Sequence, residues 1–105
     1  MTENDRQIGK TILKQIGWAN FKFLTSATAY VIEQGISIEF KGSRKASILK
    51  VRLNGGDLYD MEFLKIVKDK ETGCRESRTV KTFNDVYFDQ LIPLFESTTN
   101  LYAHF

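Results

Sequence analysis

The chain of 105 residues has one cysteine, one histidine, one proline and no long apolar run. The single cysteine, Cys74, excludes an internal disulfide, and the single histidine, His104, excludes a His-rich metal site. No uncharged apolar stretch approaches the roughly 18 residues that a membrane span needs, and the polar N-terminus lacks the apolar region of a secretory signal. We therefore expect a cytoplasmic protein that does not enter a membrane.

An excess of charge of one sign is also lacking. Fifteen Lys and Arg residues stand against thirteen Asp and Glu residues, which leaves a net charge of +2 at pH 7. This balance does not by itself indicate nucleic acid, an anionic membrane or an acidic ligand. Hydrophobic residues make up 42% of the chain, which is enough to close a core, and the length predicts a single domain over residues 1–105.

The N-terminal segment has the periodicity of an amphipathic helix. Isoleucines recur at four-residue steps over residues 8–16 and form one apolar stripe. Asn4 or Asp5 can cap the start of this helix, and Gly17 is typical of its left-handed C-terminal end. The sequence therefore predicts that the domain begins with a helix.

Alternating apolar and polar residues predict an antiparallel sheet in the middle of the chain. Residues 18–29 mix apolar side chains with turn-forming Thr and Ser, so we expect a packed connector there and a strand that begins near Tyr30. A period of two then predicts strands over residues 35–41, 47–53 and 59–63.

The last two of these strands, joined by an Asn-Gly-Gly-Asp turn, can be aligned by requiring their apolar faces to meet. One register satisfies this requirement and also sets opposite charges across from each other. It pairs Leu53 with Tyr59, Val51 with Met61, Leu49 with Phe63, Arg52 with Asp60 and Lys50 with Glu62. Two independent constraints therefore select the same hairpin.

The C-terminal part predicts a further strand and a helix. A weaker alternation over residues 75–83 is typical of an edge strand. Asn84 and Asp85 then resemble the start of a helix that extends to about Ser97, and Pro93 predicts a kink or a division into two short pieces. The whole pattern predicts an α+β fold with an N-terminal helix, a three- to four-stranded antiparallel sheet and a C-terminal helix packed on one sheet face.

Groups that can carry chemistry are few. A nucleophilic cysteine needs a base within hydrogen-bonding distance, but Cys74 lies in a polar loop and His104 next to the C-terminus, so an enzyme that uses them is our third hypothesis. Asp57, Asp60 and Glu62 could bind a divalent cation through their carboxylate oxygens. The last two, however, face basic residues of the neighbouring strand, which compensate their charge without a metal. We predict a non-enzymatic protein with no catalytic residue, no metal site and no cofactor.

One candidate binding site is the loop that contains Lys41, Arg44 and Lys45. It projects the charges of Arg44 and Lys45 from the sheet edge, which suits a phosphate backbone, and Lys10 or Lys14 can add a further contact. These residues are the candidate nucleic-acid contacts.

A second candidate site consists of aromatic residues, which gather near both ends of the chain. One small core does not easily enclose all of them, so we expect some to form an exposed patch for a protein partner or a second copy of the chain. The candidate partner-binding residues are Trp18, Phe21, Tyr87 and Tyr102.

Several short motifs are spread over the chain from residue 12 to residue 102. They are Ile12-Leu13-Lys14-Gln15-Ile16-Gly17, Leu24-Thr25-Ser26-Ala27, Lys50-Val51-Arg52-Leu53-Asn54, Asp57-Leu58-Tyr59-Asp60, Asp85-Val86-Tyr87-Phe88-Asp89-Gln90-Leu91 and Thr99-Asn100-Leu101-Tyr102. In these motifs the chain resembles a family of short uncharacterised proteins of bacteriophages and other mobile elements, with Trp18 and Ser26 where that family has glycines. The resemblance implies no activity. It implies an accessory protein of a phage or integrated element in the cytoplasm of a bacterial host cell.

The leading hypothesis is a protein-interaction module, such as an inhibitor of a host defence or replication complex. The alternative is a weak nucleic-acid-binding protein without sequence specificity. A homodimer is compatible with either hypothesis. Salt distinguishes them, because a phosphate-driven complex loses affinity steeply as salt rises and apolar docking does not.

Overall fold

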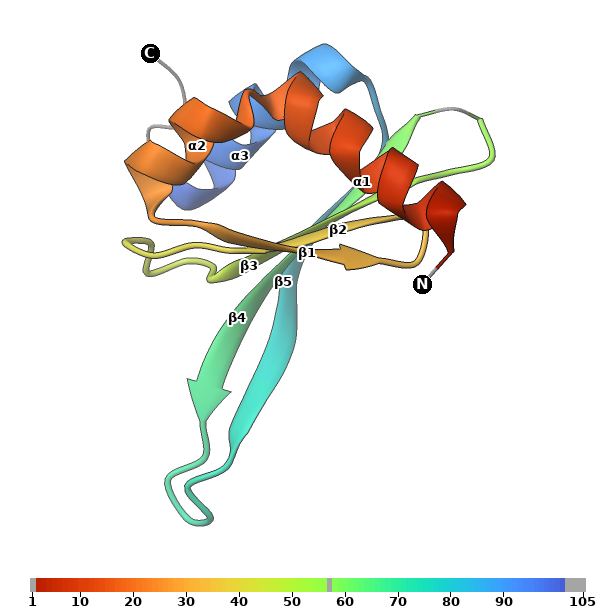
Figure 1. Ribbon diagram of the computed structural model, residues 1–105. Helices are drawn as coiled ribbons and strands as arrows, with labels where there is room; N and C mark the ends of the chain where they lie inside the picture. Colours follow the sequence, from red (N-terminus) through yellow and green to blue (C-terminus); the bar gives the residue numbers. More distant parts are fainter. Residues whose placement is uncertain (1, 57, 102–105) are drawn as a thin grey trace.

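The computed structural model describes residues 2–56 and 58–101, which form an antiparallel sheet covered by helices (Figure 1). The elements in chain order are α1 (Glu3–Ile16), α2 (Trp18–Thr25), β1 (Thr28–Ile32), β2 (Gly35–Glu39), β3 (Ile48–Leu53), β4 (Tyr59–Lys68), β5 (Arg75–Val86), the 3-10 helix η1 (Phe88–Gln90) and α3 (Leu91–Thr99). The strand order is β1-β2-β3-β4-β5. The predicted α+β class is confirmed, but the sheet has five strands instead of three to four.

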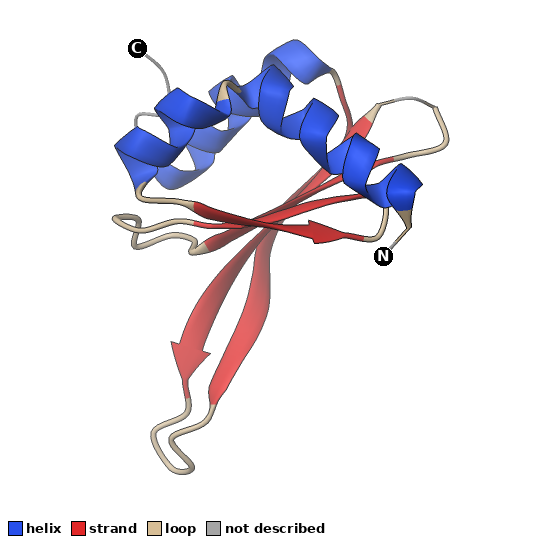
Figure 2. Cartoon of the chain, viewed as in Figure 1, coloured by secondary structure: helices blue, strands red, loops and turns tan. Residues whose placement is uncertain are grey.

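All helices lie on one face of the sheet, and the far parts of β4 and β5 leave it as a two-stranded ribbon (Figure 2). We call this ribbon, with its turn, the arm (residues 65–78). The core lies between the helices and the sheet, and Phe95 of α3 is at its centre. The Phe95 ring centroid is 4.7 Å from that of Phe21 in α2 and 4.9 Å from that of Phe40 after β2. These aromatic contacts hold α2 and α3 on the sheet.

The start of α1 is capped by Thr2, so the prediction of Asn4 or Asp5 as the cap was wrong. The Asp5 N–H donates to Thr2 Oγ1 at 3.1 Å, and the Thr2 N–H donates to Asp5 Oδ2 at 3.2 Å. Asp5 Oδ1 also accepts the Gln34 N–H of the β1–β2 turn at 2.9 Å. These bonds, that of Gln34 first, lower the pKa of Asp5. The predicted helix end is confirmed, since Gly17 has a left-handed φ of 69°.

Helix α2 occupies the segment for which we predicted a connector, so that prediction was wrong. Phe21 is buried, and Thr25 Oγ1 donates to the Phe21 carbonyl oxygen at 2.7 Å inside the helix. Ser26 then takes a left-handed φ of 52° and ends the helix. Strand β1 begins at Thr28, two residues before the predicted start at Tyr30.

The predicted register between β3 and β4 is confirmed at all five pairs. The ion pair, however, is diagonal, because Arg52 Nη1 is 3.9 Å from Glu62 Oε1. Asp60, directly opposite Arg52, accepts hydrogen bonds from Asn54 Nδ2 at 3.1 Å and from the Asp85 N–H at 3.2 Å. Amide donors from the tight turn and from β5 therefore bind Asp60, and Arg52 pairs with the next carboxylate along β4.

The predicted edge strand is confirmed as β5, but it is longer than expected. It continues through Asn84 and Asp85 to Val86, so the prediction of a helix start at residues 84 and 85 was wrong. Asp85 has a φ of 56°, and its Oδ1 accepts Asn54 Nδ2 at 2.9 Å. The helical segment that follows has two pieces, η1 and α3. Pro93 is in the first turn of α3, where a backbone N–H has no partner within the helix.

Candidate functional site

The arm extends β4 and β5 beyond the part of the sheet that the helices cover (Figure 1). Every residue from 68 to 82 is exposed. The tip is nevertheless ordered by backbone hydrogen bonds, since the Asp69 N–H donates to the Cys74 carbonyl oxygen and the Gly73 N–H to the Asp69 carbonyl oxygen, both at 2.8 Å. Cys74 is exposed at this tip, and His104 lies outside the described residues. The arm is therefore a ribbon whose two faces are both open to contact.

Two cross-strand pairs in the arm consist of like charges. Lys65 lies directly opposite Arg78, and Lys68 lies directly opposite Arg75. Side chains in such positions are about 4.5–5.5 Å apart at Cβ, and like charges there destabilise strand pairing. Because residues 65 and 68 are three apart, the two pairs lie on opposite faces of the ribbon. Within the described part of the chain, only Arg78 of the four forms an ion pair, at 3.8 Å with Glu76.

The loop between β2 and β3 is held in place by Ser43. Its Oγ donates to the Thr99 carbonyl oxygen at the end of α3 at 3.0 Å and accepts the Lys45 N–H at 3.1 Å. Ala46 is buried next to it. The loop is thus anchored to the core while the three cations predicted from the sequence stay exposed. They are Lys41, Arg44 and Lys45.

The loop and the arm lie next to each other, because the Ser47 N–H donates to the Leu64 carbonyl oxygen at 2.8 Å where β4 leaves the core. Residues 41–45 and 65–81 contain nine basic and three acidic residues, whereas the rest of the chain contains six basic and ten acidic residues. Although the net charge is small, these two segments are therefore strongly basic and the rest of the chain is acidic. We use the name basic surface for Lys41, Arg44, Lys45, Lys65, Lys68, Arg75, Arg78 and Lys81.

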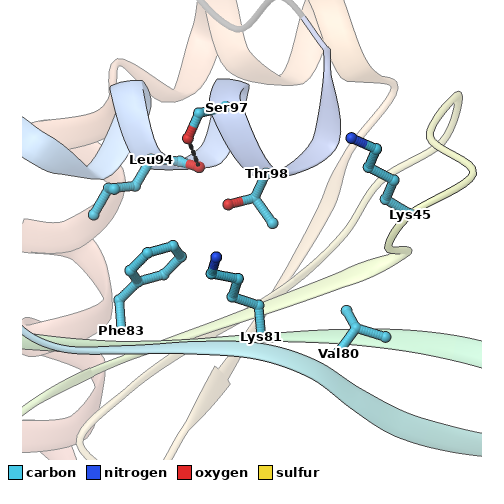
Figure 3. A pocket seen from close by; sticks show the side chains of 7 residues that line it. All are labelled: Lys45, Val80, Lys81, Phe83, Leu94, Ser97 and Thr98. Carbon is cyan, nitrogen blue, oxygen red and sulfur yellow. Dashed lines mark hydrogen bonds between the residues drawn. The ribbon is translucent and has the colours of Figure 1, made fainter.

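A β-bulge at the base of the arm brings Lys81 into this surface. Phe63 pairs with Lys81 and the next residue, Leu64, pairs with Thr79, so Val80 is an extra residue on β5. A bulge redirects side chains and increases the local twist of the strand. The side chains of Lys81 and Val80 both rise toward α3 (Figure 3).

A groove of about 390 Å³ opens between β5 and α3, beside the loop (Figure 3). Lys81 and Phe83 come from β5, Leu94, Ser97 and Thr98 come from α3, and Lys45 comes from the loop. Lys81 Nζ is 5.3 Å from the centroid of the Phe83 ring. Phe83 in turn packs edge-on against buried Phe63, with centroids 6.1 Å apart. The groove thus combines a partly buried aromatic ring with two ammonium groups from separate elements.

The other end of the sheet carries a polar cluster. Asn54 donates through Nδ2 to both Asp60 and Asp85, and its Oδ1 accepts two N–H groups of its own turn. These three residues come from three of the motifs on which the family resemblance depends, so the structure shows that the motifs meet. Among the described residues, no group of three or more His, Cys, Asp or Glu side chains is arranged to hold a metal ion. Asp57, a predicted oxygen ligand, lies outside them.

The four residues predicted to bind a partner have different surroundings. Phe21 is 1% exposed and belongs to the core, which corrects its assignment to a contact surface. Trp18 is half-buried and stacks on Phe21, with ring centroids 6.1 Å apart. Tyr87 is 58% exposed, next to Phe88 at 59%. Tyr102 lies outside the described residues.

Lys81 and the cations of the arm were not predicted from the sequence as members of a site. These cations are spaced three residues apart along β4 and β5, and the pairing that sets Lys65 opposite Arg78 and Lys68 opposite Arg75 depends on the bulge. Lys10 and Lys14 are exposed on α1. This helix packs against β1 and β2, near the sheet edge opposite β5, so the two lysines are not part of the basic surface.

Comparison of the chain with protein-family models, with curated proteins and with solved structures finds no match. Within residues 2–56 and 58–101, none of the helices has the length and apolar character needed to cross a membrane.

Proposed function

We propose that this protein is a non-enzymatic nucleic-acid-binding protein that holds phosphate groups on its basic surface. The observation that carries the proposal is the like-charged cross-strand pairing in the arm, Lys65 with Arg78 and Lys68 with Arg75. In the free protein this repulsion weakens the ribbon. A polyanion bound along the ribbon replaces the repulsion with attraction, so the arrangement favours such a ligand.

The shape of the surface supports the same conclusion. The two cation pairs lie about 10 Å apart along the strands, given a rise of about 3.3 Å per residue, and they face opposite sides of the ribbon. Lys41, Arg44 and Lys45 extend the positive charge to the base of the arm. A chain of phosphates that runs from the loop along one face of the ribbon can contact one pair, and a chain that wraps around the ribbon can contact both. Phosphate contacts carry no sequence information, so we expect weak binding without sequence specificity.

The proposal is tested by the salt dependence of binding. Fluorescence anisotropy with a labelled 20-nucleotide strand, measured from 50 to 200 mM NaCl, should give a linear fall of log K against log salt, with a slope of about −0.7 per phosphate contact. Four contacts predict a loss of affinity of about fiftyfold over this range. An affinity that does not change with salt contradicts the proposal.

A matched pair of variants locates the contacts. Arg75→Gln removes one charge from the arm and should make the slope shallower by about 0.7. Arg6→Gln removes the same charge from the exposed side of α1 and should leave the slope unchanged. Equal effects of the two substitutions would show that overall charge, and not the basic surface, drives binding.

A protein-interaction module is the second candidate, and the neighbouring aromatic residues Tyr87 and Phe88 favour it. Large exposed aromatic side chains that lie together are typical of contact surfaces. The resemblance to short proteins of bacteriophages and mobile elements gives this candidate a setting, in which the partner is a component of a host defence or replication complex or a second copy of the chain. Light scattering tests the second copy, since salt-insensitive dimers that dissociate in Tyr87→Ser would support it and a monomer at all concentrations would oppose it.

A further inference from the structure

We propose that the groove between β5 and α3 binds one nucleotide of a single-stranded nucleic acid, with its base against Phe83 and its phosphate between Lys45 and Lys81. This inference rests on the proposed function and adds a subsite and a strand preference to it. It begins from a juxtaposition that the basic surface alone does not require, namely a partly buried aromatic ring next to the ammonium group of Lys81, in a groove that Lys45 also lines (Figure 3).

The size and lining of the groove suit a nucleotide. Its volume of about 390 Å³ is within the range of about 300–1,000 Å³ that small-molecule sites occupy. Phe83 and Leu94 provide an apolar surface for a base. Ser97 donates its hydroxyl hydrogen to the Leu94 carbonyl oxygen at 3.1 Å, so its oxygen remains an acceptor for an amino group of the base.

The two lysines come from separate elements, Lys45 from the loop and Lys81 from the bulged part of β5. Each has a long stem and no ion pair with a described residue. A phosphate in the mouth of the groove can therefore contact both ammonium groups at once. Inorganic phosphate would use the lysines alone, whereas a nucleotide also covers the apolar surface.

In the free protein, Lys81 Nζ lies over the face of the Phe83 ring at 5.3 Å from its centroid. A base that stacks on this ring must displace the ammonium group. Stacking on an aromatic side chain contributes about five- to hundredfold in affinity, and an exposed cation–π contact only about two- to fivefold. The exchange therefore favours the base, and the displaced ammonium group is then free to contact the phosphate.

The position of the ring predicts a preference for single strands. Phe83 is partly buried beneath α3, so a base must leave its own stack to reach it. Bases of a single strand can turn outward at little cost, whereas a base in a duplex must first break its pairing. Duplex DNA can contact the lysines and arginines of the arm, but it cannot fill the groove.

The test uses the full chain and labelled oligonucleotides, a single-stranded 15-mer and a hairpin duplex of equal charge. The wild type should bind the single strand at least fivefold more tightly than the duplex. Phe83→Leu should weaken binding of the single strand about five- to hundredfold and leave both the duplex affinity and the salt slope unchanged. Phe83→Tyr, which keeps the ring, should restore single-strand binding. Lys81→Met should make the salt slope shallower by about 0.7, and Arg6→Gln should not.

Adenosine monophosphate and inorganic phosphate as competitors distinguish a nucleotide site from a phosphate site. The mononucleotide should displace the single strand at lower concentration than phosphate does, and Phe83→Leu should remove that difference. Thermal melting shows whether each variant is folded. If Phe83→Leu melts below the assay temperature, the salt slope of Lys81→Met tests the groove instead, because Lys81 is exposed and its substitution does not disturb the core.

The outcomes separate the two proposals. Equal affinity for single strand and duplex, or wild-type binding by a folded Phe83→Leu, would overturn the groove and leave the basic surface intact. Absence of binding to either nucleic acid would overturn both proposals. Equal competition by phosphate and mononucleotide would show that the groove takes phosphate only and would also overturn the inference.

Discussion

Lys68→Glu should raise the stability of the free protein and lower its affinity for nucleic acid. Lys68 lies directly opposite Arg75, so the substitution replaces a like-charged pair with an oppositely charged one. Cross-strand pairs differ by about 0.2–1 kcal/mol, which gives a gain of up to about 1 kcal/mol. A gain of about 1 kcal/mol corresponds to a rise in Tm of about 4–8 °C in a domain of close to this size. The gain should shrink in 1 M NaCl, where the Debye length is about 3 Å.

The loss of affinity follows from the number of phosphate contacts. Each contact with a single strand adds about 0.7 to the slope of log K against log salt, so removal of one contact lowers affinity about fourfold at 0.15 M salt. The new carboxylate repels phosphate and increases this loss. Arg6→Glu, which makes the same change of charge on α1, is the control for affinity.

Circular dichroism melts and fluorescence anisotropy measure the two effects on the same preparation. Their opposite signs are the test, because an ordinary damaging substitution lowers both quantities. A lower Tm for Lys68→Glu, or an affinity equal to that of the wild type, would refute the reasoning that the repulsion in the arm is compensated by a bound polyanion.

Three further predictions concern the core, the first helix and the thiol. Asp5→Asn should flatten the acid limb of the stability profile in urea unfolding from pH 2 to 6, and an unchanged profile would contradict the role of the carboxylate. The lowered pKa of Asp5 means that its stabilising contribution is complete above its usual value of 3.8 and is lost as the pH falls through the folded value. Phe95→Ala should lower the free energy of unfolding by about 3–5 kcal/mol, because the ring is fully buried among other aromatic rings, and a loss below about 1 kcal/mol would show that α3 is held by other contacts. Cys74→Ser should leave stability and nucleic-acid affinity unchanged, since the thiol is exposed, whereas loss of a measured enzymatic activity would restore the hypothesis of a Cys74–His104 pair.

The sheet was the most predictable part of the fold. Period-two alternation and the glycine turn were enough to predict the register of β3 and β4, because a slip of one residue would expose every apolar side chain. The helices were less predictable. The apolar residues of α2 do not form one stripe, with Phe21 buried and Phe23 77% exposed, so its period gave no helical signal.

The two wrong helix starts have a common cause. Asn4 and Asp5 are good capping residues, but Thr2 is the cap, and Asp5 lies inside the helix, where its carboxylate accepts hydrogen bonds from the backbone N–H groups of Thr2 and Gln34. Asp85 is likewise a good capping residue, but it lies in β5, where Oδ1 accepts a hydrogen bond from the distant Asn54 and the backbone N–H donates to Asp60. Local propensity identified residues that are suited to begin a helix. Their hydrogen bonds to other parts of the chain decided where they lie in the fold.

The candidate site also has one part that the sequence predicted and another that it did not. The loop cations Lys41, Arg44 and Lys45 are close together in the sequence, so this basic cluster could be predicted from the sequence alone. Lys65 and Arg78 are thirteen residues apart, and only the paired strands bring them together. The groove needed still more, because its two lysines come from a loop and a bulged strand.

The sequence by itself determined the class of fold, the alternation of the strands and their register at the tight turn, since each of these follows from the order of apolar, polar and turn-forming residues along continuous segments. Only the tertiary structure decided that the charges separate into a basic surface and an acidic remainder, and that Phe83, Lys81 and Lys45 line one groove beside α3. The physical reason is that one extra residue in β5, Val80, changes which side chains face each other and the helix, and such a bulge is set by the packing of the whole sheet.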